Sequence, residues 1–189
     1  GFASHVVVPA PFVCPVPDAV LTRHALWEVS VVSDAVSTPF QAVKRSALAS
    51  GDVAVCVGVG GIGVYGVQIA AATGARVIAL DVNDGKLEQA RVAGAAATLN
   101  VRDLPVKEMR KRVRDLAQSL NAPAHLWKIF EMSGTRAGQE TAYALLGFGA
   151  TGMHLRASWV LASITAFVLL PFFIGWLPLK LGLRQLGRI

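Results

Sequence analysis

Residues 53–63 read Val-Ala-Val-Cys-Val-Gly-Val-Gly-Gly-Ile-Gly, and residues 76–81 read Arg-Val-Ile-Ala-Leu-Asp. The first stretch has the pattern of a buried strand that ends in a glycine-rich turn, and the second has that of a strand that ends in an acid. A helix-like run separates them. Strand, glycine turn, helix, strand and terminal acid, in this order, predict a dinucleotide-binding βαβ unit.

The glycines of the turn have separate predicted roles. Gly58 permits the tight turn after the strand, Gly60 lets the backbone approach a pyrophosphate, and Gly63 lets the helix pack closely on the strand. The N-terminus of the helix then directs unpaired N–H groups towards the phosphates. A purely structural turn is the alternative, but the strand, the helix and the acid all lie at the expected spacing.

The acid that ends the second strand predicts which dinucleotide is bound. Asp81 lies 18 residues after Gly63, and a carboxylate at this place accepts hydrogen bonds from both ribose hydroxyls of an adenosine. The same negative charge repels a 2′-phosphate. The sequence therefore favours NAD over NADP as the cofactor.

Alternation of strands and helices continues along most of the chain. The pattern predicts strands near 53–57, 76–81, 97–99 and 127–131, and helices near 34–48, 62–73, 84–93, 104–120 and 136–146. Such alternation predicts an α/β fold with a parallel, doubly wound (Rossmann) sheet and a ligand site at the carboxyl ends of its strands. Residues 1–33, with four prolines, instead predict short strands and turns of a β-rich module.

Charge and cysteine content exclude some classes of function. The net charge of +6 is concentrated in residues 151–189, so it does not indicate nucleic-acid binding. The basic face of residues 104–120 is interpreted as solvated, with attraction for a phosphate-rich substrate as the alternative. Cys14, expected to be buried, and Cys56 form neither a disulfide framework nor a zinc knuckle, which predicts a cytoplasmic location.

The last part of the chain departs from this pattern. Residues 157–179 carry no charge and are long enough for a transmembrane helix. Pro171 and the basic residues after this stretch argue against a functional membrane span. Three interpretations stay open: a frameshifted or chimeric reading frame, which we favour, a membrane anchor, or an apolar tail packed on the domain.

Taken together, these residues resemble the medium-chain dehydrogenase/reductase superfamily, the zinc-type alcohol dehydrogenases. The resemblance is carried by three stretches: 1–10, 51–63 and 81–88. It implies that the chain is a fragment in three parts. These are the end of a GroES-like catalytic segment (1–33), an NAD-binding Rossmann domain that lacks its last strands (34–151) and a divergent hydrophobic, basic tail (152–189). The implied cofactor-binding residues are Gly58, Gly60, Gly61, Ile62, Gly63, Asp81 and Lys86.

The resemblance also implies the chemistry, in which zinc polarises a substrate alcohol and a hydride passes to NAD. Thr38 matches a family position beside the nicotinamide ring and is the implied catalytic residue. Asp34 occupies the place of a family zinc ligand, and two further ligands would precede Gly1. A carboxylate binds zinc or caps a helix N-terminus, and both roles stay open for Asp34.

Three stretches resemble more narrowly the 6-hydroxycyclohex-1-ene-1-carbonyl-CoA dehydrogenases: residues 1–17, 34–43 and 130–139. This likeness implies that the substrate is an acyl-CoA alcohol and that the full-length form is a homo-oligomer. The rival hypothesis is a catalytically inactive nucleotide-binding or membrane-associated remnant.

Overall fold

A parallel sheet forms the centre of the protein. The computed structural model describes residues 5, 7–121 and 127–146. Within them the strands are β1 (Val53–Val57), β2 (Arg76–Asp81), β3 (Ala97–Asn100) and β4 (Trp127–Glu131). They pair in parallel in the order β3-β2-β1-β4. This order confirms the predicted doubly wound sheet. The strand order reverses between β1 and β4, and doubly wound sheets bind their ligands at such a switch point.

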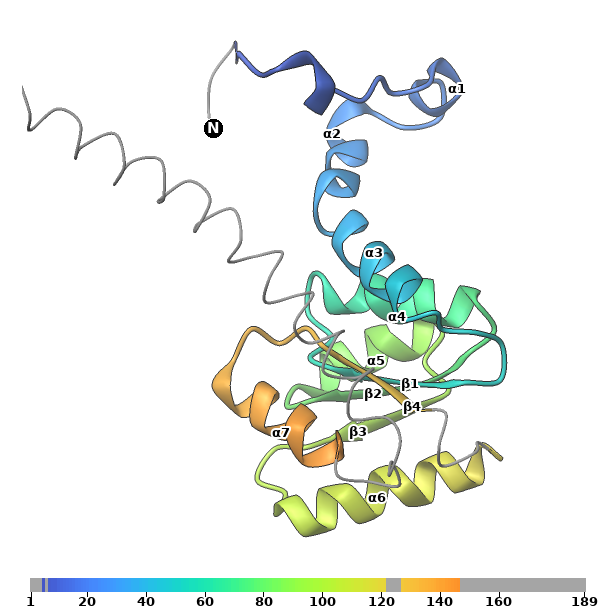
Figure 1. The fold of residues 1–189 in the computed structure, drawn as a ribbon, viewed down its shortest axis with the longest axis vertical. Coiled ribbons are helices and arrows are strands. Elements are labelled where there is room, and N and C mark those ends of the chain that lie inside the picture. Colours follow the sequence, from blue (N-terminus) through green and yellow to red (C-terminus); the bar gives the residue numbers. More distant parts are fainter. Residues whose placement is uncertain (1–4, 6, 122–126, 147–189) are drawn as a thin grey trace, which may run out of the picture.

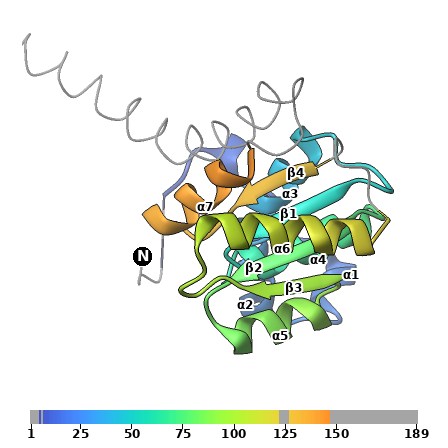
Figure 2. The ribbon, with the colours of Figure 1, turned by 90° about the horizontal axis from the view of Figure 1, so that it is seen from below.

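Helices cover both faces of this sheet (Figure 1, Figure 2). On one face lie α3 (Ser37–Arg45), α4 (Gly63–Ala72) and α5 (Asp84–Val92), and on the other lie α6 (Val106–Ser119) and α7 (Arg136–Leu146). All of these helices were predicted from the sequence, with boundaries that differ by three residues or fewer.

The side chains of β1 show why helices cover both faces of the sheet. All five residues of the strand are buried. Ala54 and Cys56 belong to the hydrophobic cluster on the α4 side, whereas Val53, Val55 and Val57 belong to the cluster on the α6 and α7 side. An apolar residue at every position of a strand is typical of a parallel sheet that is covered twice. Desolvation raises the pKa of the Cys56 thiol to about 12, so this cysteine is a neutral packing residue.

The segment before α3 differs from its prediction. Its described residues form short helical turns and contain no strand: η1 (Ala10–Phe12), α1 (Asp18–Leu21), α2 (Leu26–Val29) and η2 (Ser30–Ser33). The prediction of a β-rich module is therefore wrong for this part of the chain. Proline lacks an N–H donor for a strand ladder, and Pro9 and Pro17 each directly precede a helical turn. Cys14 is exposed, which corrects its expected burial.

These short helical turns stand away from the sheet (Figure 1). Leu26 and Trp27 are 66% and 76% exposed. Of the helices described, none is long and apolar enough to cross a membrane. The uncharged stretch 157–179 lies outside the described residues.

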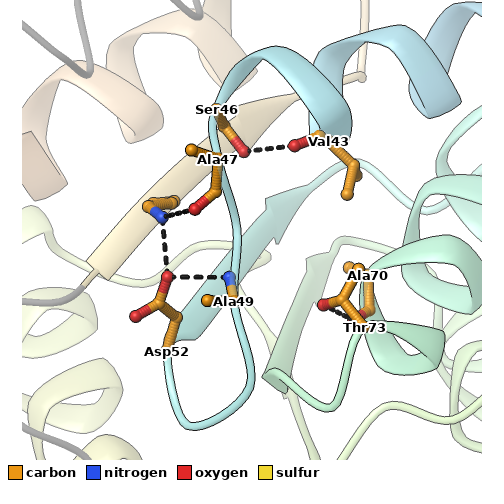
Figure 3. Close-up of polar contacts among 8 residues, drawn as sticks. Val43, Ser46, Ala47, Ala49, Asp52, Ala70 and Thr73 are labelled. Atoms are coloured by element: carbon orange, nitrogen blue, oxygen red, sulfur yellow. Dashed lines mark hydrogen bonds and ion pairs between the residues drawn. The ribbon is translucent and has the colours of Figure 1, made fainter.

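A partly buried ion pair connects the loop before β1 to the amino end of β4 (Figure 3). Lys128 Nζ donates to Asp52 Oδ2 at 2.6 Å and to the Ala47 carbonyl at 2.5 Å, and Asp52 Oδ2 also accepts the Ala49 N–H at 3.0 Å. Burial on its own raises the pKa of Asp52. The hydrogen bonds from Lys128 and Ala49, together with the Lys128 charge, outweigh that effect and hold the pKa below its ordinary value.

Candidate nucleotide-binding site

A pocket of about 590 Å³ lies at the carboxyl ends of the strands. The turns that follow β1, β2 and β4 form its walls, together with the first turns of α7. Six of the seven predicted cofactor-binding residues line it: Gly58, Gly60, Gly61, Ile62, Asp81 and Lys86. The structure therefore brings the predicted residues together, and the ligand that they bind stays a prediction.

Two glycines are fixed by their surroundings in the protein. Gly58 has a φ of +83°, and a Cβ at this position would lie 2.5 Å from Ser133 Cα in the turn after β4. A Cβ on Gly63 would lie 2.0 Å from the carbonyl oxygen of Gly58. Gly58 therefore allows the turns after β1 and β4 to touch, and Gly63 allows α4 to begin directly against the first of them.

Gly60 and Gly61, which lie between them, are not constrained in this way. A Cβ on Gly60 would meet only Lys86 Nζ, at 3.7 Å, and a Cβ on Gly61 would have no heavy atom within 4 Å. No contact within the described protein therefore requires a glycine at either position. A ligand group that approaches the backbone there would account for both, as the predicted pyrophosphate does.

Asp81 sits at the end of β2 and is 8% exposed. Its Oδ2 accepts the Val59 N–H at 2.9 Å, and its Oδ1 accepts the Asn83 N–H at 3.0 Å. Asn83 in turn caps α5, because its side chain accepts the Lys86 N–H at 3.1 Å. Asp81 and Lys86 both line the pocket, so it contains a negatively charged and a positively charged side chain.

The turn after β4 forms a wall of the pocket that the sequence analysis missed. Glu131, 7% exposed, accepts both the N–H and the hydroxyl of Ser133 through Oε1. Ser133 Oγ accepts the Thr135 N–H at 3.1 Å, and Thr135 Oγ1 accepts the Gly138 N–H at 3.0 Å. The available signal was the position of these residues after a parallel strand, since carboxyl ends of parallel strands meet at one edge.

Asp34 and Thr38 lie together at the start of α3, and Thr38 does not line the pocket. The Thr38 hydroxyl donates to Asp34 Oδ1 at 2.8 Å. Val36 occupies the N-cap position and no side chain caps the helix, so the capping role considered for Asp34 is wrong. Within the described ranges no group of three His, Cys, Asp or Glu side chains could hold a metal ion. Asp34 as a zinc ligand therefore stays a prediction.

The model of a family described as zinc-binding dehydrogenase matches residues 61–162, more than half of the chain. The chain belongs to this family. The match begins in the glycine turn, includes Asp81, Lys86 and the turn after β4, and continues past Thr151, where the resemblance ended the Rossmann domain. It therefore covers most of the pocket described above.

Individual dehydrogenases also match more than half of the chain. An alcohol dehydrogenase from Moraxella sp. (strain TAE123) is 33% identical over 114 residues, which are 60% of this chain and 32% of the relative. An alcohol dehydrogenase from Geobacillus stearothermophilus is 29% identical over 134 residues, 70% of this chain and 38% of the relative. The crystal structure of an alcohol dehydrogenase from Aeropyrum pernix superimposes with a TM-score of 0.53 at 31% identity, covering 62% of this chain and 33% of the other.

The chain spans about a third of the length of the curated relatives that it matches. The family model covers β2, β3, β4 and most of the residues that line the pocket. Family membership and the Rossmann fold are thereby established for this region.

Proposed function

We propose that this chain is the NAD-binding part of a zinc-type alcohol dehydrogenase. One observation carries the proposal: the backbone at Gly60 and Gly61, where a Cβ would meet no protein backbone, lies in the same pocket as a carboxylate at the end of β2. A dinucleotide needs both features, because its pyrophosphate approaches the backbone closely and its adenosine ribose donates hydrogen bonds to an acid.

The residues around the pocket fit this cofactor. Bound NAD would supply the carbon that accepts a hydride from the substrate. The N–H groups at the start of α4 would hold the pyrophosphate, and the Lys86 ammonium next to Gly60 would add positive charge there. The Asp81 carboxylate would accept hydrogen bonds from the ribose hydroxyls. Ile62, 37% exposed, offers an apolar surface at the pocket for the nicotinamide ring.

The preference for NAD over NADP also rests on Asp81. Its carboxylate is nearly buried, so a 2′-phosphate would be brought next to a negative charge that water screens poorly.

The substrate and the metal are proposed from the family and the sequence. The three stretches that resemble 6-hydroxycyclohex-1-ene-1-carbonyl-CoA dehydrogenases support a secondary alcohol of an alicyclic hydroxyacyl-CoA as the substrate. Membership of a zinc-binding family supports zinc, with Asp34 as one ligand and Thr38 as a catalytic residue beside it. The described residues do not fit zinc by themselves, since they provide no group of three ligands.

Calorimetric titration of the chain with NAD and with NADP tests the cofactor assignment. NAD is expected to bind more tightly than NADP. Gly60→Val is expected to abolish binding, because its side chain enters the space assigned to the pyrophosphate, where a Cβ meets only Lys86 Nζ at 3.7 Å. A folded chain that binds no NAD, or that binds NADP equally well, would refute the assignment.

A further inference from the structure

We propose that Asp81 is also a positioning residue, which ties the glycine turn to the turn after β2 and so shapes the pocket before any ligand binds. The inference rests on the proposed function, because it concerns the residue assigned there to the ribose. It adds a second role that no contact with the ribose would provide.

The two oxygens of the carboxylate hold two different segments. Oδ2 accepts the N–H of Val59, which lies between Gly58 and Gly60 and is 22 residues away from Asp81 in the sequence. Oδ1 accepts the N–H of Asn83 in the turn that leads into α5. A single side chain therefore connects the turn that would hold the pyrophosphate to the turn that would face the adenosine.

Burial makes these bonds costly to lose. Val59 is 1% exposed and Asp81 is 8% exposed, so water is a poor replacement for either partner. Hydrogen bonds to an ionised acceptor are also stronger than those between neutral groups. Loss of the carboxylate should therefore release the Val59 N–H and loosen the glycine turn, which is open to solvent at Gly60 and Gly61.

The carboxylate can perform both roles at once. Each oxygen has two acceptor sites, and one site on each is used by a backbone N–H. The remaining sites are oriented by those bonds and are available to two ribose hydroxyls. Glu131, at the end of β4, differs in this respect, because both of its hydrogen bonds within the described residues stay in its own turn.

A ligand without ribose hydroxyls separates the two roles of Asp81. If Asp81 only binds the ribose, Asp81→Ala should leave the affinity for 2′,3′-dideoxy-ADP unchanged, or improve it by removing negative charge near the phosphates. If Asp81 also holds the glycine turn, Asp81→Ala should weaken the binding of dideoxy-ADP as well, and should weaken ADP and NAD more, because these two also lose the contact with the ribose hydroxyls. We expect the second result, with the affinity for dideoxy-ADP lowered about tenfold.

Amide hydrogen exchange provides a readout that needs no ligand. In Asp81→Ala, the exchange rate of the Val59 amide is expected to rise about tenfold or more, while that of Val55 in β1 stays unchanged. Asp84→Ala is the matched control, because it removes the same charge three residues later. The Asp84 carboxylate bonds to Asn100 Nδ2 and holds neither turn, so its removal should leave the Val59 exchange rate unchanged.

Each outcome decides the proposal. The proposal would be overturned if the Val59 amide in folded Asp81→Ala exchanges as slowly as in the wild type, or if the affinity for dideoxy-ADP is unchanged. If Asp81→Ala does not fold, Asp81→Asn decides, because an amide has one acceptor oxygen and holds only one of the two turns. Slow exchange at both Val59 and Asn83 in Asp81→Asn would then overturn the proposal. If the chain binds no nucleotide but exchange at Val59 rises as expected, the proposed function fails and the positioning role stands.

Discussion

Substitution of Lys128 tests whether the ion pair at the amino end of the sheet stabilises the fold. In Lys128→Met the Asp52 carboxylate, 9% exposed, loses its cation and, among the described residues, keeps only the hydrogen bond from the Ala49 N–H. Removal of one partner from a fully buried pair costs about 3–5 kcal/mol. Because the Lys128 side chain is itself 19% exposed, we expect a loss of about 2–3 kcal/mol in the free energy of unfolding.

We expect most of this loss of stability to come from the Asp52 carboxylate, which is left without its cation. A double variant tests this. Adding Asp52→Asn to Lys128→Met removes the uncompensated carboxylate and should restore about half of the lost stability. Urea unfolding followed by circular dichroism at neutral pH measures all the variants. Arg136→Met is the control. Arg136 pairs with Glu140, and the two side chains are 92% and 65% exposed. Such exposed ion pairs contribute little to the free energy of unfolding.

The pH dependence has a defined sign. The pKa of Asp52 in the folded protein lies below its ordinary value of 3.8. The pair therefore stabilises the fold fully above pH 3.8, and this contribution is lost as the pH falls through the folded pKa. The difference between wild type and Lys128→Met should shrink in acid for the same reason. A loss below about 0.5 kcal/mol at neutral pH, or no recovery in the double variant, would refute the reasoning.

Further predictions concern the glycine turn, catalysis and the cysteines. Gly63→Ala should lower stability by about 2 kcal/mol or more, because its Cβ would overlap the Gly58 carbonyl, whereas Gly61→Ala should leave the urea midpoint unchanged. The purified chain should show no NADH formation with alcohols or hydroxyacyl-CoA esters, because its described residues provide no three-ligand metal group; zinc-dependent turnover would contradict this. A thiol reagent should modify Cys14 in the folded chain and spare Cys56, whose pKa burial raises to about 12; equal rates would contradict this.

The Rossmann elements could be predicted because their signals are local. The β1 strand is apolar throughout and is bounded by Gly51 and Gly58, both with positive φ, so its ends are visible in a short window of sequence. The position of Asp81 at the end of β2 follows from the same spacing.

The missed features depend on contacts between distant residues. A strand needs a partner, and nothing in residues 1–33 shows whether one is available, so the prolines could be interpreted either as strand boundaries or as starts of helical turns. The role of Ser133 is also hidden in the sequence, because it depends on a contact with Gly58, 75 residues earlier. The capping role considered for Asp34 came from its position before a helix, but the side chain bonds to the Thr38 hydroxyl instead of to the backbone at the helix start.

The contact between Gly58 and Ser133 has a practical consequence for protein engineering. Since the two turns touch at a distance that leaves no room for a Cβ, the glycine turn has no independent shape that could be moved to another scaffold. A transplant of residues 58–63 alone would place the turn against a foreign neighbour, and its backbone would have to shift. The transferable module is therefore discontinuous: it consists of both turns together with the strands β1 and β4 that hold them in register.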